Sequence, residues 1–277
     1  MNPARTLRCG RFDLPLDRPL VMGIVNLTAD SFSGDGLVGD FEAAVKHAFH
    51  QIDAGADLLD VGAESSRPGS LPVTADEEKA RLVPVLDALR DCGVPVSVDV
   101  YRPEVMRAAI EHGAAMINDI YALRMEGALE AVAESDCAAC LMHMRGHPAT
   151  MQENPEYENI LDAVRDFLAE RVRAAVARGI SEDRLILDPG FGFGKTVEHN
   201  FELLKNLDAV SAGGLPVLAG LSRKSMLGAI TGRGVDDRVS ASAAAALIAA
   251  QKGARVLRVH DVAATRDALK VLQAVSA

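Results

Sequence analysis

The chain has 277 residues and a formal net charge of −10, from 29 basic and 39 acidic side chains. This length allows one large α/β barrel, or two modest domains, with a sizeable buried core. The negative charge and the absence of any run of Lys and Arg argue against a nucleic-acid partner, so local cations would have to hold an anionic ligand.

No targeting or membrane segment is recognisable in the sequence. No apolar run approaches the about 18 residues of a membrane span, and residues 1–19 lack the charged-then-apolar order of a signal peptide. The four cysteines are too few for a disulfide framework and suit a reducing compartment. We therefore expect a cytoplasmic protein with no membrane partner.

Residues 1–19 alternate loosely in polarity and carry turn formers at Gly10, Pro15 and Pro19. This pattern predicts a short β-hairpin ahead of the main fold. We expect the hairpin to plug one end of that fold.

A unit then repeats eight times: an apolar run typical of a strand, a polar or Gly-containing loop, an amphipathic helical stretch, and a glycine near the helix end. The expected strands are 20–26, 58–62, 94–99, 115–119, 138–143, 185–188, 216–222 and 255–260. Among the expected helices are 41–54, 76–90, 103–112 and 158–178, and glycines typical of helix ends are Gly55, Gly93, Gly113, Gly179 and Gly253.

Strands that alternate with helices predict parallel pairing, and eight units in about 250 residues have the size of a closed (β/α)₈ TIM barrel. A doubly wound open sheet is the competing architecture, but no GxGxxG follows the first strand. No linker divides the chain. We expect one α/β domain over 1–277.

Nearly every expected strand ends in a polar or charged side chain. These side chains are Asn26, Asp60 with Glu64, Asp99, Asn118 with Asp119, His143, Asp188, Ser222 with Lys224, and Arg258 with His260. In a barrel they would meet at the carboxyl ends of the strands, where active sites lie. Any one Asp or Asn could simply cap the next helix, but this convergence predicts a site.

The strongest single stretch is 184–195, which reads RLILDPGFGFGK. Its apolar run ends in Asp188, and a proline and three glycines separated by phenylalanines follow. Glycines let the backbone approach a ligand closely, and aromatic faces can line a pocket. A Pro- and Gly-rich loop alone would be an ordinary connection, so the prediction of a pocket wall depends on the other rim residues.

One set of rim residues suits a nitrogen heterocycle. Asp99, Asn118, Asp188 and Lys224 together accept and donate hydrogen bonds in alternation. That pattern complements a fused ring with an amino group and a ring N–H beside a carbonyl, and a buried carboxylate would hold such an edge strongly.

A second set of rim residues is cationic and comprises Arg67, Arg258 and His260, with Asn26 nearby. It suits a phosphate or diphosphate, together with Mg²⁺ that shares oxygen ligands with the phosphates. Two plainer interpretations stay open, in which Arg67 is a solvated loop residue and His260 a core histidine.

Cys137, Cys140 and His143 could suggest a different metal cluster. A second CxxC pair is missing, and the three residues lie along an apolar run. We therefore interpret them as core residues rather than ligands.

Eight segments in order carry a resemblance to a known family. They are 21–33 (VMGIVNLTADSFS), 60–69 (DVGAESSRPG), 97–105 (SVDVYRPEV), 117–120 (INDI), 141–152 (LMHMRGHPATMQ), 187–195 (LDPGFGFGK), 220–228 (GLSRKSMLG) and 258–262 (RVHDV). Over essentially its whole length the chain closely resembles bacterial dihydropteroate synthase. The resemblance implies a transferase of folate biosynthesis on a (β/α)₈ barrel with Mg²⁺. That enzyme joins 6-hydroxymethyl-7,8-dihydropterin diphosphate to p-aminobenzoate, which gives 7,8-dihydropteroate and diphosphate.

The resemblance also implies roles for individual residues. The pterin ring would be bound by Asp99, Asn118, Asp188 and Lys224 and lined by Ile120, Met142, Phe193 and Gly220. The leaving diphosphate would contact Ser66, Arg67, Arg258 and His260, with Asn26 as the Mg²⁺ ligand. Ser222 opens the SRKS segment, whose helix would receive the p-aminobenzoate carboxylate. The expected catalytic set is Arg67, Lys224, Arg258 and His260.

Two loops, 28–40 and 62–72, are expected lids, and Phe32, Pro68 and Phe193 would clamp the second substrate. Some positions depart from the family pattern: Ala29 replaces the usual Pro, Ser66 replaces Thr, and SFSGDG replaces SFSDGG. Because the aspartate of SFSGDG stands one position later than that of SFSDGG, it stays open whether Asp35 takes the role of the aspartate usual in this loop.

Two other functions remain open at this stage. A methyltetrahydrofolate-using methyltransferase shares the pterin-binding barrel, but it would not need Arg67 or the SRKS segment. An inactive paralogue could act as a pterin carrier or assembly partner, although the intact Asn26, Arg67, Lys224 and His260 argue against it. The resemblance further implies a homodimer, for which the Ala-rich helix 239–250 is one possible interface.

Overall fold

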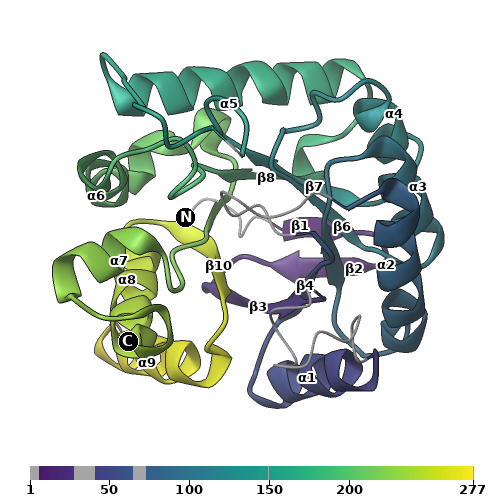
Figure 1. The fold of residues 1–277 in the computed structure, drawn as a ribbon, viewed down its shortest axis with the longest axis horizontal. Coiled ribbons are helices and arrows are strands. Elements are labelled where there is room, and N and C mark those ends of the chain that lie inside the picture. The colour runs from purple at the N-terminus through teal and green to yellow at the C-terminus, as the bar shows by residue number, and fades with distance from the viewer. Residues whose placement is uncertain (1–5, 28–40, 65–72, 149, 277) are drawn as a thin grey trace.

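A computed structural model describes residues 6–27, 41–64, 73–148 and 150–276, which form a closed barrel of parallel strands surrounded by helices (Figure 1). The order around the barrel is β10-β3-β4-β5-β6-β7-β8-β9. The strands are β3 (Leu20–Asn26), β4 (Leu58–Gly62), β5 (Val96–Asp99), β6 (Met116–Asp119), β7 (Ala138–Met142), β8 (Leu185–Asp188), β9 (Val217–Ala219) and β10 (Ala254–Val259). The (β/α)₈ prediction is confirmed.

Helices connect successive strands and cover the outside of the barrel (Figure 1). They are α1 (Phe41–Asp53), α2 (Ala75–Leu89), α3 (Pro103–Glu111), α4 (Ala128–Ala133), α5 (Ile160–Ala177), α6 (Val197–Lys205), α7 (Ser225–Thr231), α8 (Val239–Gln251) and α9 (Val262–Ser276). Local chemistry sets their ends: Thr74 and Glu77 form a capping box at α2, and Asn159 caps α5 through its side-chain oxygen. Gly55 and Gly179, predicted to end helices, have φ of 100° and 98°.

The strands are apolar because both of their faces are buried. Along β3, Val21 belongs to the buried cluster that also contains helix residues such as Leu86 of α2, whereas Met22 belongs to the separate cluster of the barrel interior. This arrangement is why the sequence shows continuous apolar runs rather than alternation. β9 is shorter than the predicted 216–222, because the chain leaves the barrel after Ala219 to form the rim segment that follows.

The predicted hairpin is present as β1 (Thr6–Cys9) and β2 (Phe12–Pro15), which pair antiparallel. Leu7 and Cys9 belong to the same buried cluster as Met22 and Met116 in the barrel interior. The Gly10 N–H donates to the carbonyl of Asp136, just before β7. The hairpin therefore closes the amino end of the barrel and leaves the carboxyl end for a site.

The cysteines near the barrel interior are structural in character. Cys9 and Cys137 are buried, and burial raises the pKa of their thiols to about 12 and about 11. Cys137 donates through Sγ to the Ala114 carbonyl, 2.7 Å away. Both thiols are therefore protonated at neutral pH.

None of the helices in the described ranges is long and apolar enough to cross a membrane.

Arg184 joins two strands at the amino end of the barrel. The residue is 4 % exposed, and its guanidinium donates to the carbonyls of Cys137 (Nε, 2.8 Å) and Val132 (Nη2, 2.8 Å). Because buried carbonyls need donors, this side chain stabilises the approach of β8 to the segment between α4 and β7.

We expect Arg184→Met to lower the free energy of unfolding by about 2–3 kcal/mol, because the buried Cys137 carbonyl loses both of its guanidinium donors. Urea unfolding followed by circular dichroism measures this loss. The control is Arg165→Met on α5, where the side chain is 47 % exposed and pairs with Asp162, so a change within about 0.5 kcal/mol is expected. Equal losses in the two variants would contradict the bonding role of Arg184.

Candidate active site

The carboxyl rim of the barrel carries the predicted site residues of the described part of the chain. Strand ends supply Asn26 (β3), Asp99 (β5), Met142 (β7) and Asp188 (β8). Asn118 lies in β6 directly beside Asp99. Arg258 lies next to the end of β10, and the other predicted residues lie in the segments that follow the strands: Ile120, Phe193, Gly220, Ser222, Lys224 and His260. Ser66, Arg67, Phe32, Asp35 and Pro68 lie outside the described residues.

A charge network centred on the fully buried Asp60 crosses this rim, and the side chains of Arg258 and Asp99 in it are 20% and 23% exposed. Arg258 donates from Nε to Asp60 Oδ2 at 2.5 Å and from Nη2 to Asp99 Oδ2 at 2.9 Å. Asn118 Nδ2 donates to the same Asp60 oxygen at 3.1 Å. The two sets predicted separately, one for a heterocycle and one for a diphosphate, are therefore joined through Arg258 and Asp99.

Burial shifts the proton affinity of the rim carboxylates. It raises the pKa of Asp99 to about 6, against the opposing effect of Arg258, and also raises the pKa of Asp188. The Arg258 pKa is raised by Asp60 and Asp99, although burial alone would lower it, so the guanidinium stays charged. A ligand that donates N–H groups to these carboxylates would stabilise their charged forms.

Asp188 is held by the glycine loop that follows it. Its Oδ1 accepts the backbone N–H of Gly190 at 2.6 Å, which orients the carboxylate. Gly190 has φ +68°, and a Cβ there would lie 1.9 Å from the His143 carbonyl oxygen. Only glycine fits this close approach of the loop to the end of β7.

Lys224, at the start of α7, lies next to the glycine loop that follows Asp188. It precedes α7, and its Nζ lies 4.3 Å from the centroid of the Phe193 ring, a cation–π contact. A Cβ on Gly192 would lie 3.2 Å from Lys224 Cδ, so the lysine stem runs along the glycine loop. The loop, the aromatic ring and the ammonium thus form one wall.

His260 and Ser222 fix each other at the ends of β10 and β9. Ser222 Oγ accepts the His260 backbone N–H at 3.1 Å and lies 3.0 Å from its Nδ1. Gln51 of α1 donates to the His260 carbonyl at 3.0 Å. The imidazole is only half-buried, so it is oriented at the rim rather than packed in the core.

An apolar cluster completes the rim. It contains the buried Ile120 and Met142, as predicted for a ring-lining surface, with the half-buried Phe193 against them. Met144, Met151, Tyr101 and Tyr121 belong to the same cluster. Flat apolar and aromatic walls next to a few directional polar groups are typical of a site for a planar heterocycle.

Two features of the rim were not predicted as site components. Asp60 was noted only as a strand-end residue, yet it is fully buried and bonds two predicted site residues; a charge inside an apolar strand was its signal. Arg102, which precedes α3, donates to Glu78 Oε2 at 2.7 Å and to the Val73 carbonyl at 2.9 Å, and it contacts Glu64. Nothing in the sequence spacing indicated that cluster.

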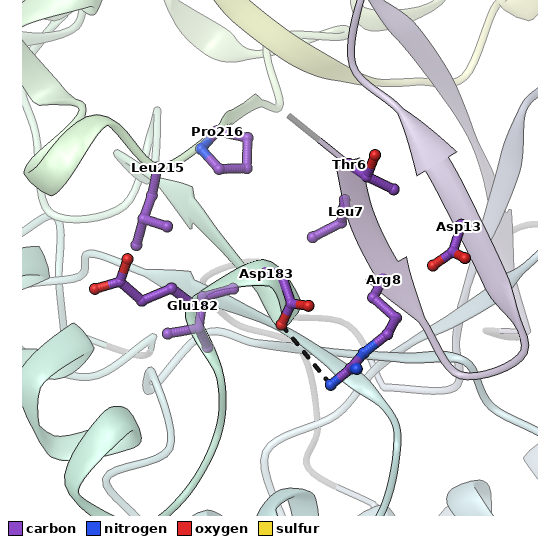
Figure 2. Close-up of a pocket in the computed structure, with 9 residues that line it drawn as sticks. Thr6, Leu7, Arg8, Asp13, Glu182, Asp183, Leu215 and Pro216 are labelled. Atoms are coloured by element: carbon purple, nitrogen blue, oxygen red, sulfur yellow. Dashed lines mark ion pairs between the residues drawn. The ribbon is translucent and has the colours of Figure 1, made fainter. Parts of the chain in front are cut away.

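A separate cavity of about 550 Å³ opens at the amino end of the barrel, beneath the hairpin (Figure 2). Arg8 and Asp13 of the hairpin line one side of it, Leu215 and Pro216 line the other, and Asp183 lies between them (Figure 2). Its cation is already engaged, because Arg8 Nη2 lies 3.1 Å from Ser181 Oγ and 3.8 Å from Asp183 Oδ1. None of the predicted site residues lines this cavity, so the rim remains the candidate active site.

Comparison with known proteins identifies close relatives of this chain. Residues 22–260 match the family described as pterin binding enzyme. The dihydropteroate synthase of Haemophilus influenzae is 49% identical over 264 residues, which cover 94% of this chain and 95% of the relative.

Two solved structures resemble this chain at a comparable level of sequence identity. Burkholderia cenocepacia dihydropteroate synthase complexed with 7,8-dihydropteroate has a TM-score of 0.91 at 49% identity, with 98% of this chain and 96% of that chain covered. The Xanthomonas albilineans enzyme with 4-aminobenzoic acid has a TM-score of 0.93 at 51% identity, with 99% of each chain covered.

We expect Asp60→Asn to lower the free energy of unfolding by about 1–3 kcal/mol, because it removes the charge that compensates a buried guanidinium. A double-mutant cycle with Arg258→Met, measured by urea unfolding, should give a coupling energy of at least about 1 kcal/mol. The control is Asp208→Asn, an exposed position, paired with the same Arg258→Met. A cycle at Asp60 that is as additive as the control cycle would rule out the network as a coupled unit.

Proposed function

The chain belongs to the dihydropteroate synthases of the pterin-binding enzyme family, and from this premise we propose how its rim serves the reaction. The enzyme is a transferase that condenses 6-hydroxymethyl-7,8-dihydropterin diphosphate with p-aminobenzoate to form 7,8-dihydropteroate and diphosphate. The observation that carries the proposal is the Arg258–Asp99 ion pair, because it links the groups suited to the pterin with those suited to the diphosphate.

The pterin ring is proposed to lie against the Ile120, Met142 and Phe193 cluster. Asp188, with Oδ1 held by the Gly190 N–H, accepts from the amino and N–H groups at one edge of the ring. Asp99 and Asn118, which lie side by side on β5 and β6, face another edge, and Lys224 donates to a ring acceptor. Support comes from the convergence of these side chains and from a relative solved with 7,8-dihydropteroate.

The diphosphate is proposed to leave toward Arg258 and His260. The bond between the pterin methylene carbon and the diphosphate oxygen breaks, the aromatic amine nitrogen bonds to that carbon, and the nitrogen loses a proton. The cations stabilise the charge that builds on the departing oxygen, so catalysis is mainly charge stabilisation and positioning. Ser66 and Arg67 are assigned to this half of the site by family resemblance alone.

A magnesium ion is proposed to assist departure of the diphosphate. Asn26 ends β3 at the rim and is half-buried, so its amide oxygen can reach a cation there. Mg²⁺ typically takes one or two protein oxygens and completes its shell with phosphate oxygens and water, which fits a single neutral donor. When bound, the ion would neutralise charge on the leaving group.

The second substrate, p-aminobenzoate, is proposed to bind beside Phe193 with its carboxylate toward the start of α7. Helix α7 begins at Ser225, as expected for the SRKS segment, and its N-cap is Lys224. The helix has only seven residues, so its dipole contributes little, and the ammonium of Lys224 is the stronger positive group near Phe193. A relative solved with 4-aminobenzoic acid supports this ligand class.

The chain is further proposed to act as a cytoplasmic homodimer. Exposed apolar side chains on α7 and α8, including Ile230 (63 % exposed) and Ile248 (43 % exposed), support an interface near the predicted helix 239–250. The unpaired, protonated thiols of Cys9 and Cys137 support a reducing compartment.

The methyltransferase and carrier alternatives are tested by the reaction itself. Purified protein given the pterin diphosphate and Mg²⁺ should release diphosphate only when p-aminobenzoate is added, with dihydropteroate as the product. Coupled detection of diphosphate and chromatography of the pteroate measure both products. Tight pterin binding without any release would instead place the carrier function first.

We expect Asp188→Asn to weaken pterin binding at least about 30-fold, because a charged acceptor inside a buried site is replaced by a neutral one that also carries donors. Isothermal titration calorimetry with the pterin measures the dissociation constant. Asp208→Asn, the same change at an exposed position, should leave it unchanged. An unchanged constant in the Asp188 variant would remove this residue from the pterin site.

A further inference from the structure

We propose that Lys195 is a positioning residue for this reaction: its buried ammonium holds the glycine loop 190–194 against the end of β7 and thereby sets where Asp188 and Phe193 meet the substrates. This inference rests on the proposed function and deepens it. Lys195 follows the loop directly and was not among the predicted site residues.

The ammonium of Lys195 lies inside a cage of acceptors. The residue is 3 % exposed. Its Nζ lies 2.9 Å from the Gly190 carbonyl oxygen, 3.0 Å from that of Phe193, 3.0 Å from His143 Nδ1 and 3.3 Å from the His143 carbonyl oxygen. One side chain therefore binds both ends of the glycine loop and the residue that follows β7.

The loop needs this internal donor because of its backbone shape. Its three glycines have φ of 68°, 77° and 60°, a conformation that is open mainly to glycine. A Cβ on Gly194 would lie 2.6 Å from the Arg145 carbonyl oxygen, so the loop is pressed against the segment after β7. Carbonyls turned inward by such a fold must find a buried donor.

Other side chains satisfy the remaining polar groups of the loop. Tyr157 donates from its hydroxyl to the Gly194 carbonyl at 2.8 Å, and Gln152 donates to the Gly192 carbonyl at 2.5 Å. Asn200 accepts the Gly192 N–H at 2.7 Å. These contacts involve the middle and the end of the loop. The Gly190 carbonyl also accepts the Phe193 N–H at 3.1 Å, so Lys195 adds a second donor there and is a donor to the Phe193 carbonyl as well.

The groups that contact the Lys195 ammonium are neutral hydrogen-bond acceptors. Its Nζ contacts three backbone carbonyl oxygens and the His143 imidazole, so the dipoles of these groups stabilise the ammonium. Burial lowers the pKa of Lys195 to about 7, with Asp188 opposing that shift, and lowers the pKa of His143 to about 2. His143 is thus neutral, and its Nδ1 can accept from Lys195.

The two carbonyls held by Lys195 belong to the residues that contact the site. Gly190 donates its N–H to Asp188, which is assigned to the pterin. Phe193 carries the ring that faces Lys224 and is assigned to both substrates. Without the ammonium, the inward carbonyls would turn toward water and take Asp188 and Phe193 out of position, and shifts of about 1 Å can cost about 100-fold in rate.

The test compares Lys195→Met with Lys205→Met, the same change at an exposed position on α6. We expect Lys195→Met to raise the KM for both the pterin diphosphate and p-aminobenzoate by about tenfold, whereas Lys205→Met leaves both unchanged. A merely structural role would lower the amount of active enzyme, and hence the apparent kcat, with both KM values intact. That result would overturn the inference.

Lys195→Gln is the second variant, because it avoids a long apolar chain next to carbonyls. Its amide is one bond shorter than the lysine side chain and carries an oxygen that would face the carbonyls, so it should hold the loop less well than the ammonium does. Circular dichroism first establishes that each variant is folded. If the Met variant fails to fold, the Gln variant decides: a rise of at least threefold in both KM values supports the inference, and any smaller change in either KM overturns it. Failure of the proposed function is distinguishable, since the parent itself would then release no diphosphate.

Discussion

The pairing of the last strand with the first strand of the barrel is the constraint on which the site depends. β10 lies beside β3, with Arg258 level with Met22, and this closure brings a guanidinium from the end of the chain to Asp60, 198 positions earlier. No open sheet with the same strands would make that contact. The buried charge pairs then stabilise the closed ring, because separating them would leave a guanidinium or a carboxylate uncompensated in the interior.

Residues that stabilise the barrel lie at its amino end, and residues suited to catalysis lie at its carboxyl end. At the amino end, the hairpin residues Leu7 and Cys9 fill the interior, and Arg184 bridges backbone carbonyls. At the carboxyl end, the same strands finish in carboxylates, amides and cations. Attraction between the opposite charges only partly offsets the cost of burying the carboxylates. Burial raises the pKa of Asp99 and Asp188 even though cations nearby oppose the shift, and a polar ligand can relieve that cost.

Rigidity at the rim comes from backbone geometry as much as from side chains. The glycine loop after β8 is compressed against His143 and Arg145, and Lys195, Tyr157 and Asn200 each hold part of its backbone. A loop fixed in this way can present a carboxylate and an aromatic ring with little freedom. Such preorganisation suits a reaction that needs placement and charge stabilisation more than proton transfer by the protein.

By itself the sequence determined the repeat of strands and helices, the closed barrel, and the identity of most rim residues. Those features follow from local hydrophobic periodicity and from the position of polar residues at strand ends, as with Asp99 and Asp188, and the order of eight family segments made the resemblance specific. Only the tertiary structure decided which rim groups touch: that Asp60 joins Arg258 to Asn118, that Lys195 lies inside the glycine loop, and that Lys224 faces Phe193. These contacts join residues on different strands and loops, and their geometry is set by barrel closure and loop packing, which leave no periodic trace in the chain.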